Sequence, residues 1–368
     1  MLWILLALAV LGLFLLAQFI LLAVVLTWED QQTLGVGYYG LPPEGREAFK
    51  AKLRQYARLL FPVLRLVGRF STFTFQKASF QQNGVAGPRG TCSADSFAKA
   101  QEYTPGPEDV FVVTQMKCGT TWMLQVVHEV LGRGRGRIVE GGTTLHAISP
   151  WIEARKTVSM EAAPLVGEER PSRIIKTHLP VTLLPWSPEA RYIYVARHPV
   201  SCFASCVDFI ATNVGRMAPP LSLVEEWFRS PEWMWWGTWT DHVQGWWERA
   251  QSEPNVLFVH FEDMKKDLGR VVDQVAAFLG MEPLTDEERA EIVRKSGFAY
   301  MQENQNAFEM HPPHILQTDA QLFVRGTSDR HKDVPADVRA RIATWVAADM
   351  KDGTYPLAQR YPDVVKSS

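Results

Sequence analysis

The sequence predicts an α/β protein whose central parallel sheet is covered by helices on both faces and is preceded by one membrane-spanning helix. From Val110 onward, short runs of apolar residues alternate with stretches of helical periodicity, as in parallel sheets with helical crossovers. Before that, residues 2–26 carry no charge and are apolar except for Gln18. This length is sufficient to cross a bilayer as a helix.

The first 27 residues are expected to form a retained, single-pass membrane anchor. A cleaved signal peptide has a shorter apolar core, a basic start and a small-x-small cleavage site, whereas this core is long and its start is not basic. The span is followed by the basic residues Arg46, Lys50, Lys52, Arg54 and Arg58. The positive-inside rule therefore favours the cytosolic side for the following domain, and the Golgi lumen stays open as the alternative.

Residues 28–100 are expected to form a linker and a juxtamembrane helix. Glycine and proline are frequent between positions 28 and 43, as in linkers. From Glu44 to Arg69, apolar residues recur at three- and four-residue steps, which predicts an amphipathic helix that Pro62 kinks or divides. This helix either lies on anionic lipid headgroups or docks on the domain. Residues 71–107 show no clear periodicity, and no element is predicted there.

Residues 101–368 are expected to form the main domain, and no internal repeat is visible in them. The predicted strands are residues 110–114, 173–176, 192–195 and 256–259. The predicted helices between and after them are residues 120–131, 200–212, 239–252 and 266–280.

The composition narrows the partners and cofactors of the chain. It has 38 basic and 40 acidic residues, so nothing indicates nucleic acid as a partner. The four cysteines form no CxxC pair, and no His/Cys spacing suits zinc, so no metal site is predicted. Cys202 and Cys206 are four residues apart on a predicted helix and are interpreted as small buried side chains.

The segment from Thr114 to Trp122 joins the first predicted strand to a helix. Gly119 permits a backbone turn that a Cβ would hinder, and the free N–H groups at the start of the helix form a site for an anion. Lys117 adds a positive charge, and Thr120 and Thr121 add hydroxyl donors. An ordinary strand–loop–helix junction is the alternative. The lysine precedes the glycine, so this is not a Walker A loop.

This order of lysine and glycine resembles the 5′-phosphosulfate loop of sulfotransferases that use 3′-phosphoadenosine 5′-phosphosulfate (PAPS). The resemblance to the cytosolic-type family covers about residues 100 to 335. Its matching segments, in order, are residues 117–122, 176–180, 196–205, 237–248 with 261–264, and 296–298. The resemblance implies a P-loop-type three-layer fold and transfer of a sulfuryl group from PAPS to a hydroxyl or amine of a small acceptor.

The resemblance also implies which residues bind PAPS. They are Lys117, Cys118, Gly119, Thr120, Thr121, Trp122, Arg197, Ser205, Phe298, Arg325 and Gly326. Trp122 and Phe298 resemble the pair that sandwiches the adenine, and Arg197 and Ser205 resemble the contacts to the 3′-phosphate that separates PAPS from ATP. Val324 stands where the family usually has a basic residue. The family's C-terminal dimerisation pattern is not visible, so the oligomeric state stays open.

Sulfuryl transfer resembles phosphoryl transfer, because positioning and charge stabilisation provide most of the catalysis. The acceptor loses a proton as it attacks sulfur, and a histidine suits that task at neutral pH. His178, in the segment Lys176-Thr-His-Leu-Pro180, is the predicted base. Lys117, the N–H groups at the start of the helix and the hydroxyls of Thr120 and Thr121 are expected to stabilise charge on the leaving phosphate. Lys176 resembles a family position near the transferring group. Because cationic residues neutralise the leaving group, no metal is needed.

For the acceptor, the sequence predicts the kind of site but not one substrate. Seven of the thirteen tryptophans lie between positions 227 and 247, and aromatic walls favour a phenol, a sterol or an aryl amine. Core packing explains Trp246 and Trp247 at least as well, and a glycan acceptor stays open. The alternative functions are a P-loop kinase or NTPase, a carbohydrate sulfotransferase with a lumenal domain, and a tethered protein that binds the nucleotide without activity.

Overall fold

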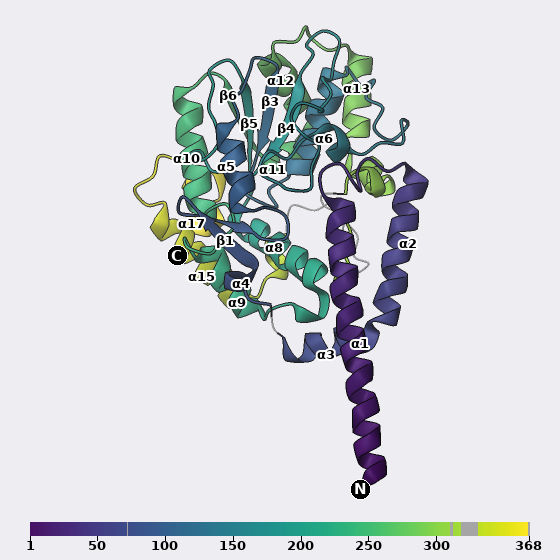
Figure 1. Cartoon of the computed structure of the whole chain (residues 1–368). Helices are drawn as coiled ribbons and strands as arrows, with labels where there is room; N and C mark the ends of the chain where they lie inside the picture. The colour runs from purple at the N-terminus through teal and green to yellow at the C-terminus, as the bar shows by residue number, and fades with distance from the viewer. Residues whose placement is uncertain (72, 310–311, 318–329, 367–368) are drawn as a thin grey trace.

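The computed structural model of the chain describes residues 1–71, 73–309, 312–317 and 330–366, and its centre is a four-stranded parallel sheet (Figure 1). The strands are β3 (Asp109–Val113), β4 (Arg173–Thr177), β5 (Arg191–Ala196) and β6 (Val256–His260). Their order across the sheet is β4-β3-β5-β6, and every neighbouring pair is parallel. All four predicted strands are confirmed.

Helices cover both faces of this sheet, because successive side chains of a strand point to opposite faces. On one face, Val112 and Val195 pack against α6 (Thr120–Leu131), α12 (Leu268–Leu279) and α13 (Asp286–Lys295). The opposite face, with Val113 and Tyr194, packs against a larger set. That set is α8 (Pro199–Val214), α9 (Leu221–Arg229), α10 (Trp239–Ser252) and α15 (Ala336–Asp349). The predicted three-layer architecture is confirmed.

The predicted helices are present, with one difference. Two of them, α6 and α10, have the predicted bounds, and α8 is longer by one residue at its start and two at its end. The prediction of one helix over residues 266–280 is wrong at its start, because α11 (Phe261–Lys266) and α12 meet there. Asp267 separates them, and its carboxylate accepts a hydrogen bond from the Arg270 N–H at 2.9 Å, so a new N-cap begins α12.

The region from 71 to 107, for which no element was predicted, contains a small hairpin. Strands β1 (Ser79–Gln82) and β2 (Val85–Pro88) pair antiparallel through Asn83 and Gly84, both at positive φ. Asn-Gly between two short runs is a hairpin signal, so this turn could have been predicted. Helices α4 (Phe75–Ala78) and α5 (Ala94–Glu102) flank the hairpin. The hairpin matters for the site because the Trp236 N–H donates to the Ala86 carbonyl at 2.8 Å.

The remaining elements are short. They are α7 (Leu145–Ile148), η1 (Gly215–Met217), α14 (Phe298–Glu303), η2 (Gln305–Ala307), η3 (Arg330–Asp333), α16 (Leu357–Arg360) and α17 (Pro362–Lys366).

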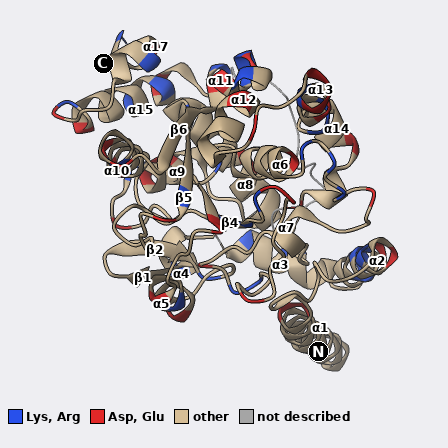
Figure 2. Cartoon of the chain, turned by 90° about the horizontal axis from the view of Figure 1, so that it is seen from above, with Lys and Arg blue, Asp and Glu red and all other residues tan. Residues whose placement is uncertain are grey.

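The N-terminal helix α1 (Leu2–Thr33) extends beyond the predicted span and has two distinct parts. Its first turns project away from the domain and expose apolar side chains, and this end of the helix is uncharged (Figures 1 and 2). Its last turns bury Val25, Glu29 and Thr33 against the rest of the molecule. The helix is long and apolar enough to cross a membrane.

Two helices follow α1 and pack beside it. They are α2 (Pro43–Leu59) and α3 (Phe61–Phe70), and the break at Leu60, just before Pro62, agrees with the predicted division. Trp28 of α1 stacks on Phe49 of α2 with ring centroids 5.3 Å apart. The base of α1 therefore belongs to a packed unit.

Candidate active site

The loop between β3 and α6 has a backbone that only certain residues tolerate. Lys117 has φ of +65° and Gly119 has φ of +108°, in the left-handed region that favours glycine. A Cβ at Gly119 would lie 2.8 Å from Cδ2 of Phe261, so a side chain at this position would collide with an aromatic ring. The loop therefore turns tightly into α6, whose first N–H groups have no partner within the helix.

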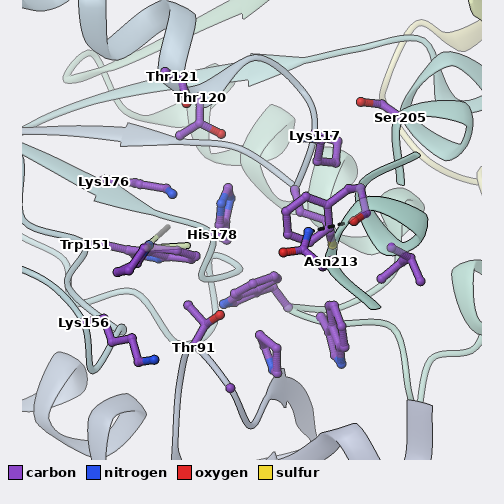
Figure 3. A pocket seen from close by; sticks show the side chains of 18 of the residues that line it. Thr91, Lys117, Thr120, Thr121, Trp151, Lys156, Lys176, His178, Ser205 and Asn213 are labelled. Atoms are coloured by element: carbon purple, nitrogen blue, oxygen red, sulfur yellow. Dashed lines mark hydrogen bonds between the residues drawn. The ribbon is translucent and has the colours of Figure 1, made fainter. Parts of the chain in front are cut away.

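The loop opens on a cavity of about 590 Å³ that gathers most of the predicted site (Figure 3). The predicted residues that line it are Lys117, Gly119, Thr120, Thr121, Trp122, Lys176, His178, Arg197, Ser205 and Phe298. Cys118 does not line it: its thiol is buried in the core, 3.6 Å from Sγ of Cys202. Arg325 and Gly326 lie outside the described residues. All four cysteines are buried and free, which confirms the interpretation of Cys202 and Cys206.

His178 follows β4, and its hydrogen bonds determine which ring nitrogen carries the proton. Its Nδ1 lies 2.8 Å from the Thr114 carbonyl oxygen and 3.2 Å from the Thr114 hydroxyl. A carbonyl oxygen only accepts, so Nδ1 must be the protonated nitrogen. The other nitrogen, Nε2, then keeps its lone pair and can accept a proton.

Buried groups hold the backbone of His178 on both sides. Its N–H donates to Oε1 of Glu153 at 2.8 Å, and that same oxygen accepts from Nε1 of Trp151 at 2.6 Å. Its carbonyl lies 2.9 Å from Nε2 of His242, whose Nδ1 lies 2.9 Å from the hydroxyl of Tyr194. Glu153 and Trp151 were not predicted, because they lie in a loop without a motif and approach His178 only through the fold.

Burial governs the charges of His178 and Lys176. It lowers the pKa of His178 well below its ordinary value, and the nearby charge of Lys176 lowers it further. Lys176 is itself 1% exposed, and its Nζ lies 3.4 Å from the ring centroid of Trp151. Burial lowers the pKa of Lys176 to about 7, although the Glu153 carboxylate opposes that shift. His178 is therefore uncharged at neutral pH.

Arg197 lies at the end of β5, close to the loop. Its Nη1 donates to the Lys117 carbonyl at 3.0 Å, and its guanidinium lies 4.4 Å from the ring centroid of Phe261. Its buried Nε has no hydrogen-bond partner among the described residues, and neither has the buried hydroxyl of Thr121. Buried polar atoms are rarely left unpaired, so these two atoms fit a bound ligand with acceptor oxygens. Ser205 of α8 lines the same cavity.

Trp122 and Phe298 lie near one another on the far side of the loop. The Trp122 Nε1 donates to the Ser296 carbonyl at 2.7 Å, and its ring meets Phe261 edge-on with centroids 5.3 Å apart. The Lys265 Nζ lies 5.9 Å from the Trp122 ring and 6.0 Å from the Phe298 ring. The two rings are thus within reach of one small group.

The tryptophan cluster divides between cavity and core. Trp235 and Trp236 line the cavity, and Trp236 lies 4.8 Å from the His178 ring by centroids. Trp227, Trp239 and Trp246 belong to the same buried core cluster as these two but do not line the cavity, and Trp247 packs against that cluster. Core packing therefore explains these four. No group of three or more His, Cys, Asp or Glu side chains within the described ranges could hold a metal ion.

Comparison with known proteins identifies the family. Sulfotransferase 1C2 of Rattus norvegicus is 30% identical over 226 residues, covering 60% of this chain and 75% of that protein. Sulfotransferase 1E1 of Mus musculus is 28% identical over 278 residues, covering 72% and 92%.

Solved structures share the fold. Mouse sulfotransferase SULT7A1 complexed with PAP superposes with a TM-score of 0.60 at 22% identity, covering 79% of this chain and 100% of that one. Retinol dehydratase in complex with androsterone and the inactive cofactor PAP also gives 0.60, at 19% identity, covering 77% and 95%. The sulfotransferase domain family matches residues 107–354, more than half of the chain, and the chain therefore belongs to the sulfotransferase family.

Proposed function

We propose that this sulfotransferase moves a sulfuryl group from PAPS to a hydroxyl or amine of a small acceptor, with His178 as the base. The observation that carries the proposal is the uncharged His178, protonated on Nδ1, in the same cavity as the phosphate-type loop. The presence of PAP in the related structures supports PAPS as the co-substrate.

The residues of the cavity divide the binding of PAPS among them. Lys117, the first N–H groups of α6 and the hydroxyls of Thr120 and Thr121 would hold the 5′-phosphosulfate. The unpaired Nε of Arg197 and the neighbouring Ser205 would hold the 3′-phosphate, because a guanidinium suits a phosphate well. Trp122 and Phe298 would contact the adenine. Arg325 and Gly326 remain predicted contacts, whereas the buried thiol of Cys118 faces Cys202 and does not line the cavity.

PAPS supplies the sulfuryl group. Nε2 of His178 accepts the proton of the acceptor while the acceptor oxygen or nitrogen bonds to sulfur. Lys117 and Lys176 stabilise the negative charge on the 5′-phosphate as its bond to sulfur breaks. Cationic side chains thus neutralise the leaving group, and the proposal needs no metal.

The walls around His178 favour a flat apolar acceptor. Trp151 and Trp236 lie with ring centroids 5.2 and 4.8 Å from the His178 ring, and such aromatic surfaces suit phenols, sterols and aryl amines. The androsterone bound to retinol dehydratase is an acceptor-sized molecule of this kind.

The chain is also proposed to be a single-pass membrane protein that retains α1. The buried Val25 supports retention, because cleavage after the apolar span would remove it from a packed unit. The positive charges after the span favour a cytosolic active site. A lumenal domain in the Golgi is the alternative.

A panel of phenols, sterols, amines and sugars incubated with PAPS and excess EDTA tests the function. Each acceptor is read by mass for the gain of one SO₃. Transfer in EDTA supports the proposal, whereas turnover that requires ATP and magnesium would support a kinase or NTPase. Transfer to the sugars alone would support a carbohydrate sulfotransferase.

Substitution of the base tests the mechanism. His178→Ala is expected to lower kcat by about 10²–10⁴-fold, the usual contribution of a general base, while PAP still binds with wild-type affinity. Lys117→Ala is expected to weaken PAP binding as well as turnover, because it removes a phosphate contact. Titration calorimetry with PAP and initial rates with PAPS give the two readouts. Unchanged kcat in His178→Ala would remove the base assignment.

A further inference from the structure

The cavity that holds His178 is walled in part by the membrane helix itself. Leu26, Glu29 and Asp30 of α1 line the same cavity as His178 and Lys117. We propose that the acceptor is a hydroxylated membrane lipid that enters this cavity from the bilayer along the base of α1. The inference rests on the proposed transfer from PAPS and names the class of acceptor.

Specific contacts hold the base of α1 in the wall. The Ile315 N–H donates to Oε2 of Glu29 at 2.7 Å, and Asp30 forms ion pairs with Lys156 at 3.3 Å and Arg155 at 3.4 Å. Lys156 lines the cavity too, below Trp151 in Figure 3. The end of α1 is therefore part of the active-site cavity and not only a tether to it.

The length of α1 places this wall close to the bilayer. About 20 residues cross the apolar core of a membrane, so residues 2–21 would be embedded and the following turns would stand outside. At 1.5 Å per residue, Leu26 lies about 8 Å beyond the apolar boundary. A lipid whose hydroxyl extends this far beyond the apolar layer would reach the part of the cavity wall that Leu26 forms.

A second element places the bilayer on the same side of the domain. Helix α3 exposes Phe61 and Phe70, at 48% and 78% of their surface, and it also carries Arg65 and Arg69. Exposed apolar and basic residues on one short helix are typical of an interfacial helix. Figure 1 shows α3 beside α1, at the edge of the domain from which α1 projects.

The segment that begins at Phe73, after α3, contributes to the cavity. Phe73, three residues after the end of α3, lines it, and its N–H donates to the carbonyl of Met217 at 3.2 Å. Met217 belongs to η1, which packs against α3 and lines the cavity with its neighbour Val214. The base of α1 and the η1 segment that packs against α3 therefore both form part of the cavity wall.

The polarity of the cavity matches an amphiphile in one orientation. The part near the loop carries His178, Lys176 and Lys117, and the α1 side carries Glu29, bonded to the Ile315 N–H, and Asp30, paired with Lys156. Apolar side chains from α1, α8, η1 and the loops around residues 73 and 316 also line the cavity. Those apolar side chains are Leu26, Phe73, Ile210, Val214, Met217 and Leu316. A hydroxyl at His178 would leave an apolar body against these side chains, which is how a lipid would arrive from the membrane.

Vesicle transfer tests the route with the full-length protein. The protein is reconstituted in phosphatidylcholine vesicles, and 4-octadecylphenol is placed either in the same vesicles or in separate ones at equal total amount. The initial rate of SO₃ transfer is expected to be several-fold higher from the same vesicles, because so long a chain leaves a bilayer slowly. The water-soluble 4-ethylphenol should react at one rate in both arrangements.

The possible results distinguish a failure of the proposed membrane route from a failure of the proposed sulfotransferase activity. Equal rates for 4-octadecylphenol in both arrangements, or transfer to 4-ethylphenol alone, would overturn membrane entry while leaving the sulfotransferase intact. No transfer to any acceptor of the wider panel would instead contradict the proposed function.

A matched pair of variants tests the wall. Leu26→Gln places a polar amide in the cavity wall and is expected to raise the KM for 4-octadecylphenol about tenfold, with little change for 4-ethylphenol. Val24→Gln adds the same side chain two residues away, at an exposed position that does not line the cavity, and should leave both KM values unchanged. Equal effects of the two substitutions would overturn the assignment of α1 to the acceptor site.

Discussion

Burial lowers the pKa of both His178 and Lys176, and the two shifts have different consequences. His178 stays uncharged over the neutral range and can act as a base without first losing a proton. Lys176, with a pKa of about 7, loses its charge in the free enzyme as the pH rises through that value. The same burial that keeps His178 uncharged therefore also limits the positive charge beside it.

The pH dependence of PAPS use follows from Lys176. In the free enzyme, kcat/KM for PAPS is expected to fall above pH 7, by up to about tenfold per unit, because the protonated lysine is the form that attracts the phosphosulfate. Glu153→Gln should move this limb to lower pH, since the Glu153 carboxylate raises the pKa of Lys176. Initial rates from about pH 5.5 to 9 measure the position of this limb.

An exposed carboxylate provides the control for that measurement. Glu161→Gln makes the same chemical change on the surface and should leave the limb in place. A profile that rises through the ordinary pKa of histidine would contradict the proposed state of His178, and a flat profile would contradict the role of Lys176.

Several residues of the candidate site could be predicted from the sequence. Lys117, His178 and Arg197 were predicted because each stands in a short motif at the end of a strand, where parallel sheets gather their ligands. Glu153 has no such context, since it approaches the His178 N–H from 25 residues away. Contacts of this kind depend on the packed loops, which no spacing in the sequence describes.

The loop between β3 and α6 is an element whose geometry is set by one glycine. Gly119→Ala is expected to weaken PAP binding by about 10²-fold, as a displacement near 1 Å does at a reacting centre, because the added Cβ would collide with Phe261. Stability should also fall by about 1–3 kcal/mol from the strained backbone. Calorimetry with PAP and chemical denaturation measure the two effects.

Gly84→Ala is the matched control for the loop. Gly84 has φ of +79°, and a Cβ there would meet nothing within 4 Å, so only backbone strain is added in the β1–β2 turn. It should lower stability by about 1 kcal/mol and leave PAP affinity unchanged. Equal loss of PAP affinity in both variants would show that the collision with Phe261 is not the cause.

Elements were predictable to different degrees for physical reasons. The strands of the sheet are buried on both faces, so their apolar runs stand out, and α6 and α10 were predicted to the residue. The hairpin around Asn83 and Gly84 is small and its strands are short, so its pattern was too brief to detect by periodicity. The break between α11 and α12 depends on one N-cap hydrogen bond to Asp267, which hydrophobic periodicity does not reveal.

At the scale of the whole molecule, the packed base of α1 predicts how the protein is processed. The intact mass of the protein from its native membranes is expected to include residues 1–27. Cleavage after the span would remove Val25 and leave Phe49 and Leu53, its neighbours in the same cluster, without that partner. A mature chain that starts after residue 27 would contradict the retained anchor.

The orientation of the domain has its own test. In sealed microsomes, added protease is expected to digest the domain, because the basic residues after the span favour the cytosolic side. Protection that is lost only when detergent opens the vesicles would place the domain in the lumen.

The sequence could not predict that the base of the anchor helix α1 packs on the sulfotransferase domain. The apolar span and the sulfotransferase segments were each evident from their own residues. That Leu26 and Glu29 line the cavity that holds His178 depends on how α1 packs on a domain far along the chain. Only the three-dimensional structure brings the two together.

The left-handed backbone of Lys117 has a consequence for attempts to make this protein more heat-resistant. A residue with a Cβ at φ of +65° is strained by about 1–3 kcal/mol, and glycine would relieve that strain while removing the ammonium group. A screen that rewards heat resistance alone would therefore collect glycine at this position and discard activity. A selection for thermostability therefore has to measure product formation at the same time.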